Sequence, residues 1–586
     1  MGTLDWFAVG LYVLTAVGIG VYFTKRASRS TTDFFVAGRT LPWLIAGTSM
    51  VATSFSADTP LFVAGMSRQT GIFSNWFWWS LAIGQIATVF FFARLWRRTE
   101  ALTDIEFIVK RYEPSKAISI LRVFKVFFDG VLRNCVIIAS VTLAMAKILK
   151  VLLNLSDTAL FHIPVLGDVT STMVLLFILG GSAVLYSSLS GLYGVVYTDL
   201  VQFALAMIGS IGLAVIVYVD ASSGAGLMEK LSGAPDFKSS LLNFFPELST
   251  LNLATFTFFV YIFVVWWAQV PGEGLYVQRL LATRSEKDSF LSFLWYNICH
   301  YVIRPWPWIM VGLLSLYYLP HLEDAETAFP RMIDLFLPVG LKGVMVASLL
   351  AAFMSTLDTH LNWGASYLVN DLYRPFIARD KSAKHYVLAS RICMVLLTIV
   401  ALIVTSQLSS ILGAYKYLWM ILSGVGTVMI ARWYWWRVNA YSEIAAIVAS
   451  VIVGNYLEIK LPSTAEADLF AVRVVIITAV VTSVWVVVTF LTSKTPGKQT
   501  AAFYSQMKIG GLGWKKVREA AGIKPVVGEF KENFIAWLSC VVFLYSLLLG
   551  IGKFIFHEWS LGLLYLGVTI VSGYILKRFM GKMRFD

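Results

Sequence analysis

The chain alternates long apolar runs with short polar segments. The apolar runs are continuous, and most reach the length of about 18 to 20 residues that a helix needs to cross a bilayer. Continuous runs of this length favour helices over strands. We therefore predict about fifteen membrane-spanning helices. Their approximate ranges are 4–24, 41–66, 72–97, 119–152, 172–190, 194–219, 254–282, 288–318, 335–371, 386–407, 408–437, 441–457, 467–492, 529–553 and 557–580.

The composition agrees with a protein that lies in a membrane. Of the 586 residues, 58% are hydrophobic and 14% are charged, whereas about 25% of the residues in a typical soluble domain are charged. Backbone groups in lipid must bond within the protein, which leaves helices or a closed barrel as the spanning structures. The predicted fold class is therefore an all-α, polytopic membrane protein surrounded by the lipid bilayer.

Lysine and arginine gather in alternate loops. With the predicted spans, the basic loops all lie on one side of the membrane: 25–40, 93–118, 279–287, 372–385 and 493–528. The loops on the other side are neutral or acidic: 153–171, 220–253, 319–334 and 455–468. Because basic loops stay in the cytoplasm, we predict a protein of the cell (inner) membrane with its N-terminus outside and its C-terminus cytoplasmic. The net charge of +13 then belongs to residues that flank the membrane, and it does not indicate nucleic acid.

Two of the apolar segments are interrupted in mid-span. Met50–Gly65 contains Pro60 among small hydroxyl residues, and Trp266–Arg279 contains Pro271 and Gly272. Proline removes a backbone donor and clashes with the preceding turn. Such breaks persist at membrane depth where the freed backbone groups line a cavity, and matched breaks in two halves of a chain mark a transporter's binding site. The alternative is a pair of ordinary kinked helices.

The two breaks divide the chain into segments. Each opens a set of five predicted spans, and we expect the polar segment 493–528 to be a solvated cytoplasmic linker rather than a regulatory element. The predicted segments are an extra helix and basic loop (1–40), a first repeat (41–219), an extracellular loop (220–253), a second repeat (254–437), additional helices (438–492), the linker (493–528), and two C-terminal helices with a basic tail (529–586).

A third apolar segment carries an unusual polar stripe. In AAFMSTLDTHLN, Ser355, Thr356 and Thr359 lie three or four residues apart on one helix face, with Asp358 beside them. Polar groups in hydrocarbon are costly without a partner. A small alkali cation is one such partner, since hydroxyl and carbonyl oxygens suit it. Hydrogen bonding between helices through serine and threonine is the alternative.

Three motifs together make the sequence resemble the sodium:solute symporter family, whose helices follow the leucine-transporter type of 5+5 inverted repeat. The first is AAFMSTLDTHLNWGASYLVNDLYRPF at Ala351–Phe376. The second is YSSLSGLYGVVYTDLVQ at Tyr186–Gln202, and the third is ARWYWWRVNAYSEIAAIVAS at Ala431–Ser450. The resemblance covers roughly residues 1–490 and implies a transporter, not an enzyme.

The resemblance implies where sodium binds. The main sodium site would be formed by the carbonyl groups of the first broken helix and by the polar stripe. Its ligands would be the backbone carbonyls of Ala52, Phe55 and Ala352 and the hydroxyls of Ser355 and Thr356. Some members have a second cation site, which would use Asp199, Asp358 and Thr359 here. Asp358 replaces a serine of the usual pattern, so it would strengthen cation binding or bind a proton instead.

The resemblance also implies a solute site between the two broken helices. The predicted substrate-binding residues are Ser54, Ser56, Asp58, Thr59, Trp78, Arg133, Trp266 and Gln269. Arg133 is informative because a guanidinium in an apolar span needs an anionic partner. We therefore favour an organic anion, such as a carboxylate or sugar acid, as the solute. If Arg133 pairs with Asp58 or Asp129, the solute would instead be a neutral sugar, polyol or amino acid.

The predicted function is import of a small organic solute, coupled to Na⁺, by alternating access. A membrane enzyme is disfavoured because the chain has no zinc-binding HExxH motif, phosphate-binding glycine loop or nucleophile elbow. A membrane substrate sensor or a channel is the alternative from another class. The stretch after residue 493 contains only a linker and two helices, which is little for a sensor's output.

Overall fold

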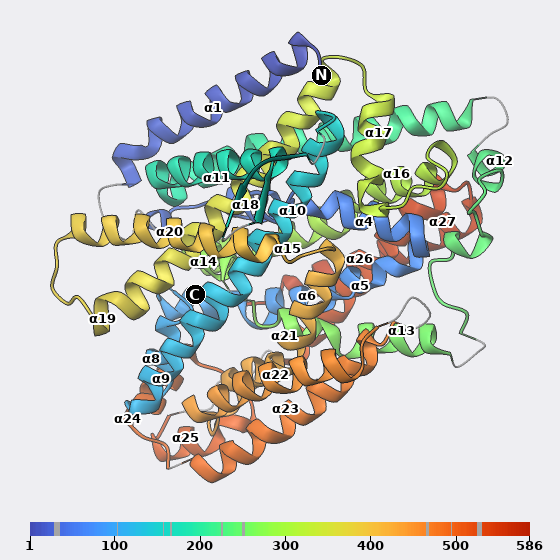
Figure 1. Ribbon diagram of the computed structural model, residues 1–586. Coiled ribbons are helices and arrows are strands. Elements are labelled where there is room, and N and C mark those ends of the chain that lie inside the picture. The colour runs from blue at the N-terminus through green and yellow to red at the C-terminus, as the bar shows by residue number, and fades with distance from the viewer. Residues whose placement is uncertain are drawn as a thin grey trace.

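We analysed a computed structural model of the chain (Figure 1). The structure describes residues 1–27, 36–101, 103–155, 158–164, 167–181, 192–223, 227–248, 252–272, 274–463, 468–493, 495–523 and 530–585. Apart from one short hairpin, the described elements are helical. The long α-helices are α1 (Thr3–Ala27), α10 (Asn134–Leu152), α11 (Ser171–Ser222), α18 (Leu341–Ser366), α20 (Ala383–Thr405), α21 (Ile411–Tyr434), α22 (Ala440–Lys460), α23 (Phe470–Thr492), α26 (Phe530–Ile555) and α27 (Trp559–Met580).

The remaining helices are short, and several join into one bent span. The short α-helices are α3 (Trp43–Ser54), α4 (Asp58–Thr70), α5 (Trp76–Trp79), α6 (Leu81–Phe91), α7 (Ala93–Thr99), α8 (Glu106–Arg111), α9 (Lys116–Lys125), α12 (Leu227–Ser232), α13 (Leu253–Phe263), α14 (Leu275–Ala282), α15 (Glu286–Ile298), α16 (Pro305–Tyr318), α17 (Ala328–Phe336), α19 (Arg374–Phe376), α24 (Lys498–Met507) and α25 (Lys515–Ala520). The 3₁₀ turns are η1 (Ala37–Arg39), η2 (Ile72–Asn75), η4 (Ser239–Leu242), η5 (Val265–Gln269), η7 (Ala325–Thr327) and η9 (Leu512–Trp514), and π-helical turns form η3 (Val126–Arg133), η6 (Cys299–Ile303) and η8 (Tyr367–Tyr373).

Both predicted breaks are present. The first separates α3 from α4 at residues 55–57. The second lies between η5 and α14, where Gly272 and Gly274 have φ angles of 81° and 60°. Glycine accepts this left-handed region without strain. The second break therefore coincides with glycines, whereas the first lies at residues 55–57, just before Pro60, which stands in the first turn of α4.

The first broken helix lies deep in the molecule. α3 packs against α11, α15 and α18, and α4 packs against α16. The approach of α4 to α16 is close, because a Cβ added at Gly312 would lie 2.4 Å from the carbonyl oxygen of Ala64. In Figure 1, α1 runs along the outside of α11, while α22 and α23 lie side by side at the opposite end. The break is thus enclosed by helices from both predicted repeats.

α11 is bounded by Ser171 and Ser222 and covers two of the predicted spans, 172–190 and 194–219. The predicted division between them, at residues 190–194, overlaps residues 182–191, which lie outside the described residues, and it stays a prediction. The preceding loop contains an antiparallel hairpin, β1 (Ala159–Ile163) with β2 (Gly167–Thr170), that the sequence pattern did not indicate.

Nine of the described helical stretches are long and apolar enough to cross a membrane, or ten if the bent pair at Ile72–Phe91 and Ala93–Thr99 counts as one span. The predicted number of about fifteen is not reached by this measure. Breaks divide several predicted spans into helices that are too short for it, such as α3 with α4 and α15 with α16. The membrane character of the fold is nevertheless plain.

The described part of the predicted linker 493–528 is folded onto the helices. Phe503, Tyr504 and Trp514 are buried, and the Trp514 indole donates a 2.7 Å hydrogen bond to the carbonyl of Trp433. α24 packs against α7 and α8. The prediction of a solvated linker gave weight to the lysines of this segment and too little to its aromatic residues, which bury their surface against the helix ends.

Candidate functional site

The polar stripe of α18 faces the break in the first helix. The hydroxyl of Thr356 donates to the carbonyl of Thr53 at 3.2 Å and to the carbonyl of Ala352 at 2.9 Å. The hydroxyl of Ser355 donates to the same Ala352 carbonyl at 3.2 Å. All of these residues are buried. Because each hydroxyl hydrogen points to a protein carbonyl, the oxygen lone pairs remain available to a cation.

The end of α3 supplies further oxygens at this point. The amide of Phe55 bonds to the carbonyls of Val51 and Ala52 at 2.8 and 3.0 Å, and the helix then ends. The last carbonyls of a helix carry the negative end of its dipole, which attracts cations. The predicted sodium ligands Ala52 and Phe55 therefore lie at a helix C-terminus opposite the hydroxyls of Ser355 and Thr356. The combined donor set consists of hard, uncharged oxygens.

The oxygens predicted for a second cation bond to an arginine. In α14, Arg279 donates from Nη2 to Asp199 Oδ2 at 3.4 Å and to Thr359 Oγ1 at 3.3 Å. The same nitrogen donates to Thr53 Oγ1 at 2.7 Å, and Nε donates to Ser49 Oγ at 2.9 Å. We had placed Arg279 in a cytoplasmic basic loop, whereas its side chain is fully buried. Asp358, the third predicted residue, has its Oδ1 bonded to the amide of Asn362 at 2.8 Å.

A cavity of about 150 Å³ lies between the two broken helices. Six of the eight predicted substrate-binding residues line it: Ser54, Ser56, Thr59, Trp78, Arg133 and Gln269. Asp58 does not, because its carboxylate bonds to the hydroxyl of Tyr415 at 2.6 Å, and Tyr415 lines the cavity instead. Trp266 also lies outside the lining and packs against Trp267 and Trp537.

Arg133 lies at the edge of this cavity in a cluster of charges. Its Nη1 is 3.7 Å from Asp129 Oδ1, while the ammonium of Lys125 is 2.5 Å from Asp129 Oδ2. The three residues carry two positive charges and one negative charge. They lie on η3 and the preceding turn, where π-helical geometry interrupts the α-helix that leads into α10, and such π-bulges are frequent at functional sites.

Two histidines that we did not predict also line the cavity. Arg304 donates to Nδ1 of His300 at 2.7 Å, and arginine has no acceptor, so the proton of His300 lies on Nε2. Asn134 donates its amide to the carbonyl of His360 at 2.8 Å, so its Oδ1, 2.6 Å from Nδ1 of His360, accepts from that ring nitrogen. The first imidazole is therefore a donor at Nε2 and the second an acceptor.

Arg304 closes the end of α3. Its guanidinium donates to the carbonyls of Val51 and Ser54 at 3.3 and 2.8 Å. The ring faces of Phe55 and Trp308 lie 5.2 and 5.1 Å from its Cζ. An ionisable residue within a membrane span is a functional candidate by default. By that rule Arg304 and the two histidines are functional candidates, but the sequence alone does not show which residues they bond to.

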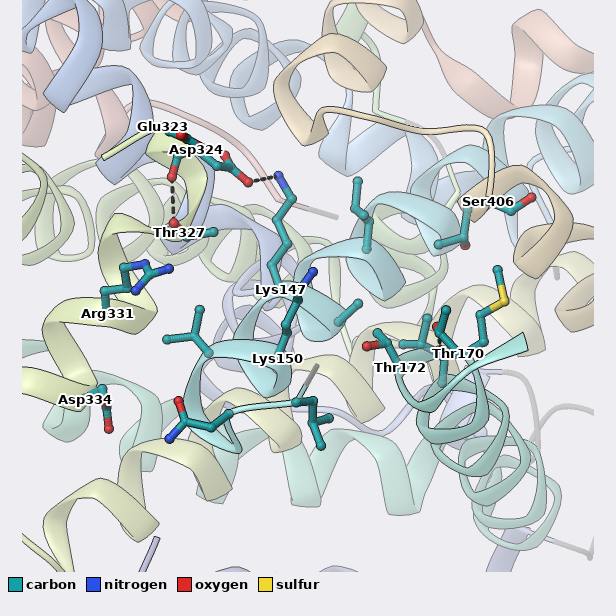
Figure 2. Close-up of a pocket in the computed structure, with 18 of the residues that line it drawn as sticks. Lys147, Lys150, Thr170, Thr172, Glu323, Asp324, Thr327, Arg331, Asp334 and Ser406 are labelled. Carbon is teal, nitrogen blue, oxygen red and sulfur yellow. Dashed lines mark hydrogen bonds and ion pairs between the residues drawn. The ribbon is translucent and has the colours of Figure 1, made fainter. Parts of the chain in front are cut away.

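A larger cavity of about 1740 Å³ lies at the other end of α10 and shares no lining residue with the first. Figure 2 shows Lys147, Lys150 and Arg331 around it, together with acidic residues of the segment before α17. Lys147 bonds to Asp324 at 2.8 Å and to Glu326 at 2.6 Å. None of the predicted sodium or solute residues lines this space, which by the predicted orientation opens to the outside.

Two broken helices that enclose a small polar cavity, with hydroxyls facing a helix C-terminus, define a secondary transporter of the broken-helix type. The family model described as the sodium:solute symporter family matches residues 34–454. The chain belongs to this family, as the three motifs indicated. Sodium is accordingly the coupling ion, and the protein is a transporter rather than an enzyme.

Individual relatives agree with this assignment. The chain is 27% identical over 520 residues to a sodium/glucose cotransporter of Vibrio parahaemolyticus, a match that covers 82% of this chain and 91% of the relative. It is 24% identical over 472 residues to a sodium/sialic acid symporter of Aliivibrio fischeri, covering 77% and 86%. A solved structure of a Na⁺-coupled sialic acid symporter in a substrate-bound outward-open state superimposes with a TM-score of 0.65 at 18% identity, covering 85% and 99%. The last match confirms the predicted all-α transporter fold.

Proposed function

We propose that this chain imports a small organic anion together with sodium by alternating access. The observation that carries the sodium part is the contact between α3 and α18, where the hydroxyl of Thr356 lies 3.2 Å from the carbonyl of Thr53. A sodium ion bound to the carbonyls of Ala52, Phe55 and Ala352 and to the hydroxyls of Ser355 and Thr356 links these helices. It thereby favours the conformation in which the neighbouring cavity accepts the solute.

The charge at the cavity supports an anionic solute. Arg133 lines the cavity and lies 3.7 Å from the carboxylate of Asp129, which Lys125 also contacts. A solute carboxylate placed against the guanidinium forms a bidentate, charge-assisted pair. A cavity of about 150 Å³ holds a molecule of roughly the size of benzene. The preferred solute is thus a small carboxylate.

The other cavity groups favour a solute with additional polar groups. Gln85 lines the cavity, and its Oε1 has no hydrogen-bond partner among the residues that the structure describes. The imidazoles of His300 and His360 add a donor and an acceptor at the same cavity. A hydroxyl or amino group on the carboxylate satisfies these atoms. The second candidate solute is a neutral sugar, polyol or amino acid, and the observation that favours it is the pairing of Arg133 with Asp129 at 3.7 Å.

The coupling is thermodynamic. Each ligand must raise the affinity for the other by the same factor, and a membrane potential of 100 mV adds about 2.3 kcal/mol for each sodium ion that enters. We propose that the chain lies in the cell inner membrane with its N-terminus outside, so that the outer cavity faces the medium. Low sodium in the cytoplasm then empties both sites.

A screen of the purified protein tests this function. Melting temperatures are measured with organic acids, sugars and amino acids, with and without sodium. We expect a small carboxylate that stabilises the protein only with sodium, and we expect Arg133→Ala to lose that effect. Stabilisation by neutral sugars alone contradicts the anion preference. In proteoliposomes, sodium-driven concentrative uptake of the hit supports a symporter, whereas passive flux contradicts it.

A further inference from the structure

An aromatic patch with two positive charges lies where α21 leads into α22. Trp436 forms its centre, and the Cζ of Arg437 and the Nζ of Lys516 lie 5.5 and 5.7 Å from the centroid of its ring. Arg437 also lies 5.4 Å from the ring of Phe490, near the end of α23. Arg437 follows Trp436 directly in the chain, whereas Lys516 comes from α25. Two segments far apart in sequence therefore bring their cations to one indole.

The turn before α25 is held at this place by backbone contacts. The amide of Trp436 donates a 3.2 Å hydrogen bond to the carbonyl of Gly513. A Cβ added at Gly513 would lie 1.9 Å from the carbonyl oxygen of Tyr434, so glycine is needed for the two segments to approach this closely. The buried indole of Trp514, which follows directly, adds a second anchor. Lys516 is thus presented beside Trp436 by a fixed turn.

The two cations of the patch have no carboxylate of their own. Neither Arg437 nor Lys516 forms an ion pair with a carboxylate among the residues that the structure describes, and Lys516 is exposed while Arg437 is half-buried. The adjacent lysine differs, because the ammonium of Lys515 lies 3.8 Å from the carboxylate of Glu519. Two positive charges on one indole without an internal counterion favour an anion from outside the protein.

The surroundings of the patch place this anion at the membrane surface. Phe490 and Leu491 are 56% and 79% exposed, although both belong to α23, which is long and apolar enough to cross a membrane. In a bilayer such surface contacts acyl chains. Tryptophan is enriched at the level of the lipid headgroups, and basic pockets beside membrane helices on the cytoplasmic side bind anionic headgroups. In the proposed orientation this end of α23 is the cytoplasmic end.

We propose that Trp436, Arg437 and Lys516 bind the phosphate headgroup of an anionic phospholipid, whose acyl chains lie along Phe490 and Leu491. The guanidinium and the ammonium contact the phosphate, a ligand for which arginine is especially suited. The bound lipid links α25, which lies outside the region matched by the family model, to the junction of α21 and α22. The site is separate from the proposed transport function and shares with it only the orientation in the membrane.

Lipid binding to the full-length protein in a neutral detergent tests the site. The probe is phosphatidylglycerol, and native mass spectrometry measures the affinity of the most tightly bound lipid. The wild type retains phosphatidylglycerol in preference to phosphatidylcholine with the same acyl chains. One basic residue near a membrane surface changes the affinity for anionic lipid by about five-fold. The paired variant Arg437→Gln/Lys516→Gln therefore binds phosphatidylglycerol roughly 30-fold more weakly. Lys515→Gln is the matched control and binds as the wild type does, because Glu519 already pairs with Lys515.

Three results overturn the inference. They are equal retention of phosphatidylcholine, displacement of the lipid by an equal concentration of soluble glycerol phosphate, and wild-type affinity for phosphatidylglycerol in the paired variant. If the paired variant does not fold, Lys516→Gln decides alone, since the side chain of Lys516 is exposed. Its affinity falls about five-fold, and an unchanged affinity overturns the site. The readout needs neither sodium nor solute, so it stands or falls separately from the proposed function.

Discussion

The hydroxyl of Thr356 in α18 donates a 3.2 Å hydrogen bond to the main-chain carbonyl of Thr53 at the end of α3. Three hundred and three residues separate the two in the chain. The contact brings the polar stripe onto the carbonyl groups that the break in the first helix leaves without helical partners. In the proposed function, a cation between them neutralises the helix C-terminus and holds the two elements together, so that sodium controls access to the adjacent cavity.

The solute preference depends on Arg133. Replacing it with alanine removes a charge-assisted hydrogen-bonding group worth about 1.5–3 kcal/mol, which lowers solute affinity by roughly 10- to 100-fold. Arg133→Lys keeps the charge but loses the planar fork and binds with intermediate affinity. Solute titrations at saturating sodium measure both variants. Equal affinity in the wild type and Arg133→Ala would contradict an anionic solute at this position.

The capping of α3 by Arg304 predicts a second effect. Arg304→Leu removes the 2.8 Å hydrogen bond to the half-buried carbonyl of Ser54, at a cost of about 1–3 kcal/mol. Since Ser54 adjoins the proposed sodium ligand Phe55, we expect both the melting temperature and sodium affinity to fall. Arg304→Lys retains a positive charge, so its melting temperature and its sodium affinity fall less. Wild-type sodium affinity in Arg304→Leu would show that the cap does not support the ion site.

The close contact between α4 and α16 predicts that an uncharged substitution at this contact lowers stability. Gly312→Ala places a Cβ 2.4 Å from the carbonyl oxygen of Ala64, and such overpacking costs typically about 1–3 kcal/mol. The control is Gly567→Ala in α27, where nothing lies within 4 Å of the added carbon. Tryptophan fluorescence during heating measures both. Equal melting temperatures for Gly312→Ala and Gly567→Ala would contradict the close packing of the first broken helix.

The proposed orientation can be tested with single cysteines. Gln407 and Lys508 are both exposed, and they lie on opposite sides of the membrane in the predicted topology. In a background with Cys393→Ser, which removes the one half-buried native thiol, a membrane-impermeant maleimide applied to intact cells should label Gln407→Cys and not Lys508→Cys. The reverse pattern would place the N-terminus in the cytoplasm.

Much of the scaffold follows from local sequence. Gly272 and Gly274 stand at the second break, where their positive φ angles suit glycine, and Pro60 stands in the first turn of α4, just after the first break. The spacing of Ser355, Thr356 and Thr359 places these residues on one face of a helix in the same way.

The partners of the buried charges could not be predicted in this way. Arg279 reads as the first residue of a basic loop, and only the folded chain shows that it reaches Asp199, 80 residues away in sequence. The sequence predicts Asp58 as a solute ligand, but its carboxylate accepts a hydrogen bond from the hydroxyl of Tyr415. In each case the missing information is which distant segment packs against the helix, and a single sequence carries no record of that.

The most direct test of the central claim is sodium affinity in the paired variant Ser355→Ala/Thr356→Val, measured by equilibrium binding of radioactive sodium to the full chain. These substitutions nearly keep the side-chain volumes and remove both hydroxyl oxygens. Loss of two ligands predicts a fall in sodium affinity of at least about 10-fold while the protein stays folded. Sodium bound as tightly by the paired variant as by the wild type would contradict the account.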